Sequence, residues 1–253
     1  MTQEDLTALA GLLELAECYE HELPAAPAAL LPPRGREIAS WIDHTLLKPE
    51  ATPSQVDVVC AEALQYGFAG VCVNPSYVPQ VARLLLGSQV LVSSVVGFPL
   101  GATLPTHKVY ETLSCLEAGA AEIDMVINIG ALKGQKYGQV LNEIQAIAQV
   151  CHNQGAVLKV ILEMAFLTRR EKIIGCLLSQ SAGADFVKTS TGFGPSGAIV
   201  EDVDLMYRVV GDQLKVKAAG GIRNLQTSLA MIGAGASRLG SSAGVQIIQE
   251  ATA

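Results

Sequence analysis

Short apolar runs alternate with longer segments of helical periodicity from Trp41 to the end of the 253-residue chain. This alternation is typical of parallel strands joined by crossover helices. Eight runs have the composition of strands, namely WIDHTLL (41–47), GVCVN (70–74), VLVSSVV (90–96), EIDMVIN (122–128), LKVILEM (158–164), DFVKTS (185–190), LKVKAAG (214–220) and SRLGS (237–241). Eight strand–helix units in about 200 residues predict an α/β protein with the (β/α)8 TIM-barrel fold.

The main alternative is a doubly wound open sheet. Such a sheet usually has a glycine-rich dinucleotide-binding turn after its first strand, and the segment IDHTLLKPEATP (42–53) lacks one. The clearest helix between strands spans 52–66. There, Thr52 as N-cap, Pro53 at the first position and Gln55 form a capping-box pattern, and Gly67 can end the helix.

Residues 1–40 lack the alternation of strand-like and helix-like segments that predicts the barrel over residues 41–253. A helical stretch runs from about Glu4 to Tyr19, and four prolines in the following HELPAAPAALLPPRG (21–35) prevent the helix from continuing. Because leucines form a broad apolar face on this helix, we expect an N-terminal helical extension that packs on the barrel. The alternative is a flexible leader.

Composition and charge narrow the functional classes. The formal net charge of −7 and the lack of a basic stripe argue against nucleic-acid binding, and no apolar run is long enough to span a membrane. The acidic start does not resemble a secretory signal, so we expect a cytoplasmic protein. Six isolated cysteines suit reduced thiols, and four scattered histidines give little support to a metal site. A small anion remains possible where local positive charge gathers.

Charged residues within three apolar strands are the main candidates for chemistry. Lys188, Lys217 and Asp124 lie in the sixth, seventh and fourth strands, and charged side chains are rarely buried unless they are paired or functional. Two inward-pointing lysines on adjacent strands lie close together. A second cation and partial desolvation lower the pKa of an amine, which favours imine formation.

Structural interpretations stand beside these chemical ones. A strand-end lysine such as Lys188 can extend to water, and Asp124 can be a plain partner for a lysine. Asp43, in the first strand, is a weaker candidate for a proton network or a turn cap. Cys72 is more typical of the core than of catalysis.

The loops after the last two predicted strands have the composition of a phosphate-binding site. AAGGIRN (218–224) and LGSSAG (239–244) place glycines and serines where barrels usually hold a phosphate group with backbone N–H groups. Arg223 can add an ionic contact. Either loop alone could be an ordinary tight turn, but the two together predict a phosphate site.

Taken together, DHTLLKP (43–49), EIDMVINIG (122–130), FVKTSTGF (186–193), VKAAGGIR (216–223) and RLGSSAG (238–244) resemble the deoxyribose-phosphate aldolase family over about residues 40–250. The resemblance implies a class I aldolase without metal or cofactor. Such an enzyme reversibly splits 2-deoxy-D-ribose 5-phosphate into acetaldehyde and D-glyceraldehyde 3-phosphate, as in deoxyribose phosphate catabolism. It also implies a homo-oligomer, either a dimer or a tetramer.

The resemblance further implies roles for individual residues. Lys188 is the Schiff-base nucleophile, and Asp124 and Lys217 are the proton donor and acceptor. Asp43, Cys72 and Thr191 are possible near-site residues. The implied substrate- and phosphate-binding residues are Gly192, Gly220, Gly221, Arg223, Gly240, Ser241 and Ser242.

One position departs from the family pattern. Some members have a lysine where this chain has Phe193, which puts one ionic phosphate contact in doubt. Two rival functions remain at this point. One is another imine-forming barrel, such as an aldolase or transaldolase acting on a longer sugar phosphate. The other is a barrel that only binds a sugar phosphate.

Overall fold

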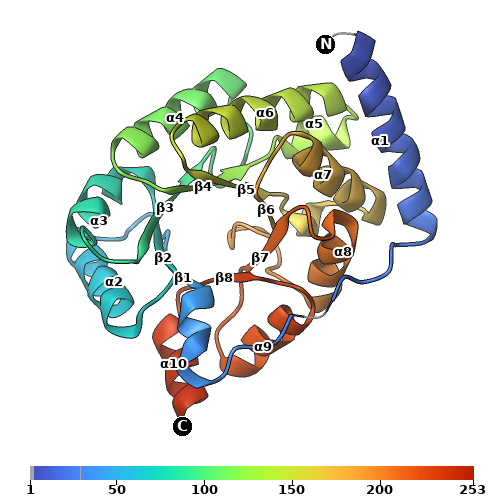
Figure 1. Ribbon diagram of the computed structural model, residues 1–253. Coiled ribbons are helices and arrows are strands. Elements are labelled where there is room, and N and C mark those ends of the chain that lie inside the picture. Colours follow the sequence, from blue (N-terminus) through green and yellow to red (C-terminus); the bar gives the residue numbers. More distant parts are fainter. Residues whose placement is uncertain (1–2, 29) are drawn as a thin grey trace.

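The computed structural model describes residues 3–28 and 30–253, so residues 1, 2 and 29 of the predicted extension lie outside the described residues. Eight parallel strands form a closed barrel in which neighbours follow chain order and β1 pairs with β8 (Figure 1). The strands are β1 (Ile42–Leu46), β2 (Gly70–Val73), β3 (Leu91–Val96), β4 (Glu122–Val126), β5 (Val157–Ile161), β6 (Phe186–Lys188), β7 (Lys215–Ala219) and β8 (Arg238–Ser241). The predicted (β/α)8 barrel is confirmed, and the open sheet is excluded.

Helices surround the barrel. They are α1 (Gln3–His21), α2 (Pro53–Tyr66), α3 (Val78–Leu84), α4 (Pro105–Glu117), α5 (Ile129–Lys133), α6 (Tyr137–Asn153), α7 (Arg169–Ser181), α8 (Val200–Val210), α9 (Leu225–Gly233) and α10 (Gly244–Thr252), with short 3-10 turns at Gly35–Trp41, Pro75–Tyr77 and Met164–Phe166. The signals predicted for α2 are present. The Gln55 side chain accepts a hydrogen bond from the Thr52 backbone N–H at 2.9 Å, and Gly67 ends the helix in the left-handed conformation. No helix of the described residues is long and apolar enough to cross a membrane.

The apolar core lies between the outer faces of the strands and the helices. Side chains alternate along each strand, so Ile123 and Met125 of β4 face the helices while Asp124 faces the barrel interior. The same alternation turns Leu158 and Val160 of β5 outward. Because this outer layer supplies the hydrophobic burial, the interior of the barrel is free to hold charged groups.

The N-terminal segment lies outside the barrel, and α1 packs along α7 (Figure 1). Ala16 is fully buried in this contact, and Arg170 of α7 forms an ion pair with Glu20 at 2.9 Å. Beyond α1 the chain crosses α8, where Arg208 donates hydrogen bonds to the carbonyls of Pro24 and Leu23. The segment is therefore attached by side chains of two barrel helices.

We predict that Ala16→Asp releases α1 from α7, because a carboxylate at this fully buried position would lose its hydration. Amide hydrogen exchange of α1 should become much faster than in the wild type. Ala10→Asp is the matched control, since it makes the same change on the exposed face of the same helix. Equal exchange in the two variants would contradict this packing.

Candidate active site

A buried carboxylate joins the two predicted catalytic lysines inside the barrel. The Nζ atoms of Lys188 and Lys217 each donate a hydrogen bond to Oδ2 of Asp124 at 2.7 Å. The two lysines are register partners on neighbouring strands β6 and β7, and Asp124 reaches them from β4. All three predicted catalytic residues are thus brought together, with a negative charge between the two amines.

The other oxygen of Asp124 is held from β5 and β3. Lys159 donates to Oδ1 at 3.0 Å and Ser93 donates to it at 3.4 Å. Lys159 also donates to Glu122 at 2.5 Å and is fully buried. With all four contacts on its two oxygens, the Asp124 carboxylate has little freedom to rotate.

Asp43, the weaker candidate, proves to be part of the same network. It forms a very short hydrogen bond to Lys217 Nζ and accepts another from Arg238 at 2.6 Å. Arg238 also reaches Glu122 at 3.3 Å, which links the ends of the network. The interior cluster therefore contains four basic side chains and three carboxylates, namely Lys159, Lys188, Lys217 and Arg238 with Asp43, Glu122 and Asp124.

Neighbouring charges keep Asp124, Asp43 and Lys217 ionised despite burial. Burial alone raises the pKa of Asp124, but the charges of the surrounding lysines outweigh it and hold that pKa well below its usual range. The pKa of Asp43 is likewise lowered, because nearby cations outweigh burial. Burial lowers the pKa of Lys217, yet Asp124 and Asp43 raise it above its ordinary value, so this amine stays protonated.

A cavity of about 390 Å³ opens above the cluster at the carboxyl ends of the strands. Lys188 and Thr191 line it, and so do all seven predicted phosphate-binding residues: Gly192, Gly220, Gly221, Arg223, Gly240, Ser241 and Ser242. Asp124, Lys217, Asp43 and Cys72 are fully buried and are not among its lining residues. Lys188 is therefore the member of the charged cluster that a ligand in the cavity can reach.

Close approach of neighbouring groups explains why two residues that line the cavity, Gly220 and Gly240, are glycines. A Cβ built on Gly220 would lie 2.9 Å from Cα of Gly197 and 3.4 Å from Cα of Gly192, and Gly220 has a positive φ of 89°. A Cβ built on Gly240 would lie 3.3 Å from Cε of Lys217. These positions need glycine because two loops and the side chain of Lys217 meet there.

Phe193 gives the cavity an aromatic rim. It is half-exposed, and its ring meets that of Phe98 edge-on with a centroid distance of 5.4 Å. The cavity has a second cation beside Arg223, because Lys48 from the loop after β1 also lines it. Sequence reasoning missed Lys48, although it stands within the DHTLLKP motif.

Lys159, Glu122, Arg238 and Ser93 were also missed by sequence reasoning. The sequence does contain a signal for Lys159, because this lysine interrupts an apolar strand as Lys188 and Lys217 do. Cys72 is buried against Leu47 and Val95, and burial raises the pKa of its thiol. A protonated thiol is a poor nucleophile, so Cys72 is a core residue beside the site.

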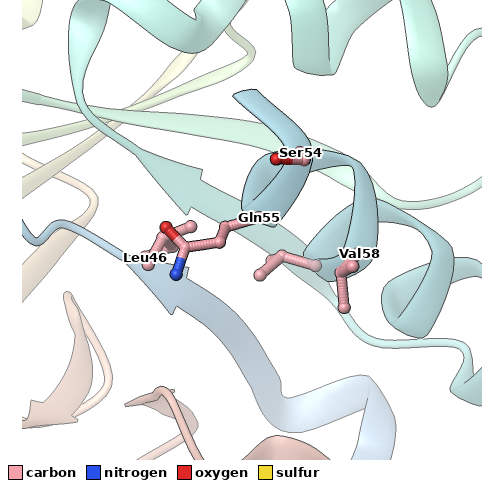
Figure 2. Close-up of a pocket in the computed structure, with 5 residues that line it drawn as sticks. Leu46, Ser54, Gln55 and Val58 are labelled. Atoms are coloured by element: carbon pink, nitrogen blue, oxygen red, sulfur yellow. The ribbon is translucent and has the colours of Figure 1, made fainter. Parts of the chain in front are cut away.

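A second hollow and the distribution of potential metal ligands offer no alternative active site among the described residues. A hollow of about 410 Å³ on the outside, between the end of β1 and α2, is lined by Leu46, Ser54, Gln55, Val58 and Val59 (Figure 2). It contains no ionisable side chain, so it offers no group for imine chemistry. Among the described residues, no group of three or more His, Cys, Asp or Glu side chains is arranged to hold a metal ion.

Comparison with known proteins gives consistent matches. The model of the DeoC/LacD family aldolases matches residues 38–250. The deoxyribose-phosphate aldolases of Staphylococcus epidermidis and Thermococcus gammatolerans are 56% and 54% identical over 211 and 220 residues, covering 83% and 86% of this chain and 95% and 97% of the relatives.

Solved structures extend the comparison. The crystal structure of a candidate deoxyribose-phosphate aldolase from Coccidioides immitis superposes with a TM-score of 0.90 at 44% identity, covering 96% of this chain and 97% of that one. Much of the 40-residue extension therefore lies within that match. The deoxyribose phosphate aldolase of Aeropyrum pernix gives a TM-score of 0.80 at 35% identity, covering 85% of this chain and 90% of that one.

The lowered pKa values of Asp43 and Asp124 should make the free energy of unfolding depend on pH in acid. Below about pH 3.9, aspartates of the unfolded chain bind protons while Asp43 and Asp124 stay ionised in the folded state, so stability falls as pH falls. Each such group contributes a slope of about 1.4 kcal/mol per pH unit. In urea unfolding between about pH 3.5 and 2.5, Asp43→Asn should show a slope smaller by that amount. An unchanged slope would contradict the lowered pKa of Asp43.

Proposed function

Because the chain belongs to the DeoC/LacD family of aldolases, we propose that it reversibly cleaves 2-deoxy-D-ribose 5-phosphate into acetaldehyde and D-glyceraldehyde 3-phosphate. Relatives named deoxyribose-phosphate aldolase, with more than half of their aligned residues identical over most of the chain, support this substrate. The observation that carries the proposal is the position of Lys188. It lies on the cavity wall, 2.7 Å from a carboxylate that also binds Lys217.

Lys188 acts as the nucleophile in this proposal. Its free amine attacks the sugar aldehyde and loss of water gives a protonated imine, which serves as an electron sink. The charge count of the cluster supports an uncharged amine. With Lys188 neutral, the three remaining cations match the three carboxylates of the cluster.

Asp124 and Lys217 move the protons. The shifted pKa values keep Asp124 ionised and Lys217 protonated in the resting enzyme. In this proposal the Asp124 carboxylate is therefore the group available to accept a proton, and the Lys217 ammonium is the group available to donate one. Removal of the proton from the C3 hydroxyl breaks the C2–C3 bond and releases glyceraldehyde phosphate. Protonation of the remaining enamine and hydrolysis then free acetaldehyde and Lys188.

The far end of the cavity suits the phosphate group. Glycine-rich loops after β7 and β8 offer backbone N–H groups, and Lys48 and Arg223 add positive charge. Holding the phosphate there fixes the distance from the anion to the aldehyde carbon. A cavity of about 390 Å³ is consistent with a five-carbon sugar phosphate.

Self-association and cellular location are separate proposals. The Aeropyrum pernix relative is described as having a unique tetrameric structure, and we extend self-association to this chain as a proposal. The cytoplasmic location expected from the sequence stays a prediction.

Borohydride trapping tests the proposal. After incubation with acetaldehyde and reduction, peptide mass spectrometry should locate an ethyl group on Lys188. The folded Lys188→Leu variant should neither trap acetaldehyde nor cleave the sugar phosphate. Turnover by that variant would exclude Lys188 as the nucleophile. Binding of the sugar phosphate by the wild type without any adduct would favour a binding-only barrel.

A further inference from the structure

The segment 189–199 links the strand of the proposed nucleophile to α8 and contains neither helix nor strand. Thr191, Gly192 and Phe193 of this segment line the substrate cavity. A loop that shapes a binding site without a regular hydrogen-bond ladder needs another source of rigidity. The contacts made by Glu163 provide it.

Glu163 lies in the loop after β5 and reaches into the curve of the segment. Its Oε2 atom accepts two hydrogen bonds from Thr191, one from the backbone N–H at 3.2 Å and a very short one from the hydroxyl. The Thr191 hydroxyl oxygen in turn accepts the backbone N–H of Phe193 at 3.0 Å. One carboxylate oxygen thus fixes three consecutive residues, 191–193.

The arrangement is costly for the fold. Glu163 has a positive φ of 55°, in the left-handed region that side chains other than glycine rarely adopt. Its side chain is buried, and Oε1 accepts no hydrogen bond within the described residues, although Glu163 is one of the residues that line a small cavity of about 120 Å³. A strained backbone and a buried carboxyl group with one unpartnered oxygen occur here together, which points to a functional reason.

The segment fits closely around this carboxylate. A Cβ built on Gly194 would lie 2.9 Å from Oε1 of Glu163. Any larger residue would crowd the carboxyl group, so glycine lets the backbone run close to it. At the other end, the backbone N–H of Ala198 donates to the carbonyl of Gly220, which lines the cavity, at 3.0 Å. The segment is therefore held at one end by Glu163 and at the other by the loop after β7.

We propose that Glu163 is a positioning residue, which anchors residues 191–194 and so sets the wall that receives the sugar phosphate. The proposal rests on the proposed function for its substrate. Glu163 makes no contact with Lys188 or Asp124 among its hydrogen bonds. Loss of the anchor should therefore weaken binding of the phosphorylated substrate and leave imine formation intact.

The test compares Glu163→Ala and Glu163→Gln with the wild type. For Glu163→Ala, the KM for deoxyribose phosphate should rise at least about tenfold, because charge-assisted hydrogen bonds are lost. The rate of borohydride-trapped imine formation with acetaldehyde, which has no phosphate, should stay within about twofold. Glu163→Gln keeps an acceptor oxygen for Thr191, so its KM should lie between the other two.

Glu171→Gln is the matched control. That carboxylate lies on the helix that follows the same strand and accepts hydrogen bonds from Thr168 and Lys133, away from the cavity. It should change neither KM nor imine formation. Should Glu163→Ala fail to fold, Gly194→Ala disturbs the same contact from the loop side and should give the same separation of effects.

Hydrogen exchange separates this proposal from the proposed function. Exchange of residues 189–199 should rise in Glu163→Ala and stay unchanged in Glu171→Gln, whichever sugar phosphate the enzyme accepts. An unchanged KM together with unchanged exchange would overturn the anchor. So would a parallel loss of imine formation and substrate binding. Failure of the wild type to cleave deoxyribose phosphate would overturn only the proposed substrate.

Discussion

The ion pairs of the Asp124 carboxylate are the interactions on which the barrel interior depends. One oxygen binds Lys188 and Lys217, and the other binds Lys159. A carboxylate removed from water is stable only when such partners replace its hydration, and three buried amines are stable only around such a carboxylate. Each charge therefore stabilises the others, and the loss of one member leaves its neighbours buried and unpaired. This mutual dependence also fixes the geometry that imine chemistry needs.

The rest of the fold makes room for that network. Outward-facing aliphatic side chains of the strands and the helices around them form the apolar core, so the interior need not supply hydrophobic burial. Glycines at 220 and 240 let the loops and the Lys217 side chain approach closely enough to form the cavity. The cavity exposes Lys188 to a ligand and keeps Asp124 and Lys217 beneath it. The same packing therefore gives a ligand access to the proposed nucleophile and keeps the proposed proton relay buried.

Sequence patterns predicted the barrel, because strand periodicity and helix capping are local signals. They also singled out Lys188, Lys217 and the seven loop residues that line the cavity with Lys188, because strand-end lysines and paired glycine loops stand out in a single sequence. The roles of these residues stay predictions. The resemblance to the aldolase family is confirmed by the family model and the relatives. Lys159 was overlooked although it interrupts an apolar strand as Lys188 and Lys217 do. Arg238 lies at the start of a strand, and its carboxylate partners are more than 100 residues away in the chain. Glu163 was missed because backbone strain and an unpaired buried oxygen have no signature in the sequence.

Asp124 is an ionised carboxylate shared by the protonated amines of Lys159 and Lys217. Neutron diffraction from a deuterium-exchanged crystal reveals these protonation states, because it locates each proton of the network. We expect no deuteron on Asp124 or Asp43 and three deuterons on each of the Nζ atoms of Lys159 and Lys217. A deuteron on the Asp124 carboxylate, or a neutral amine at Lys217, would contradict this assignment.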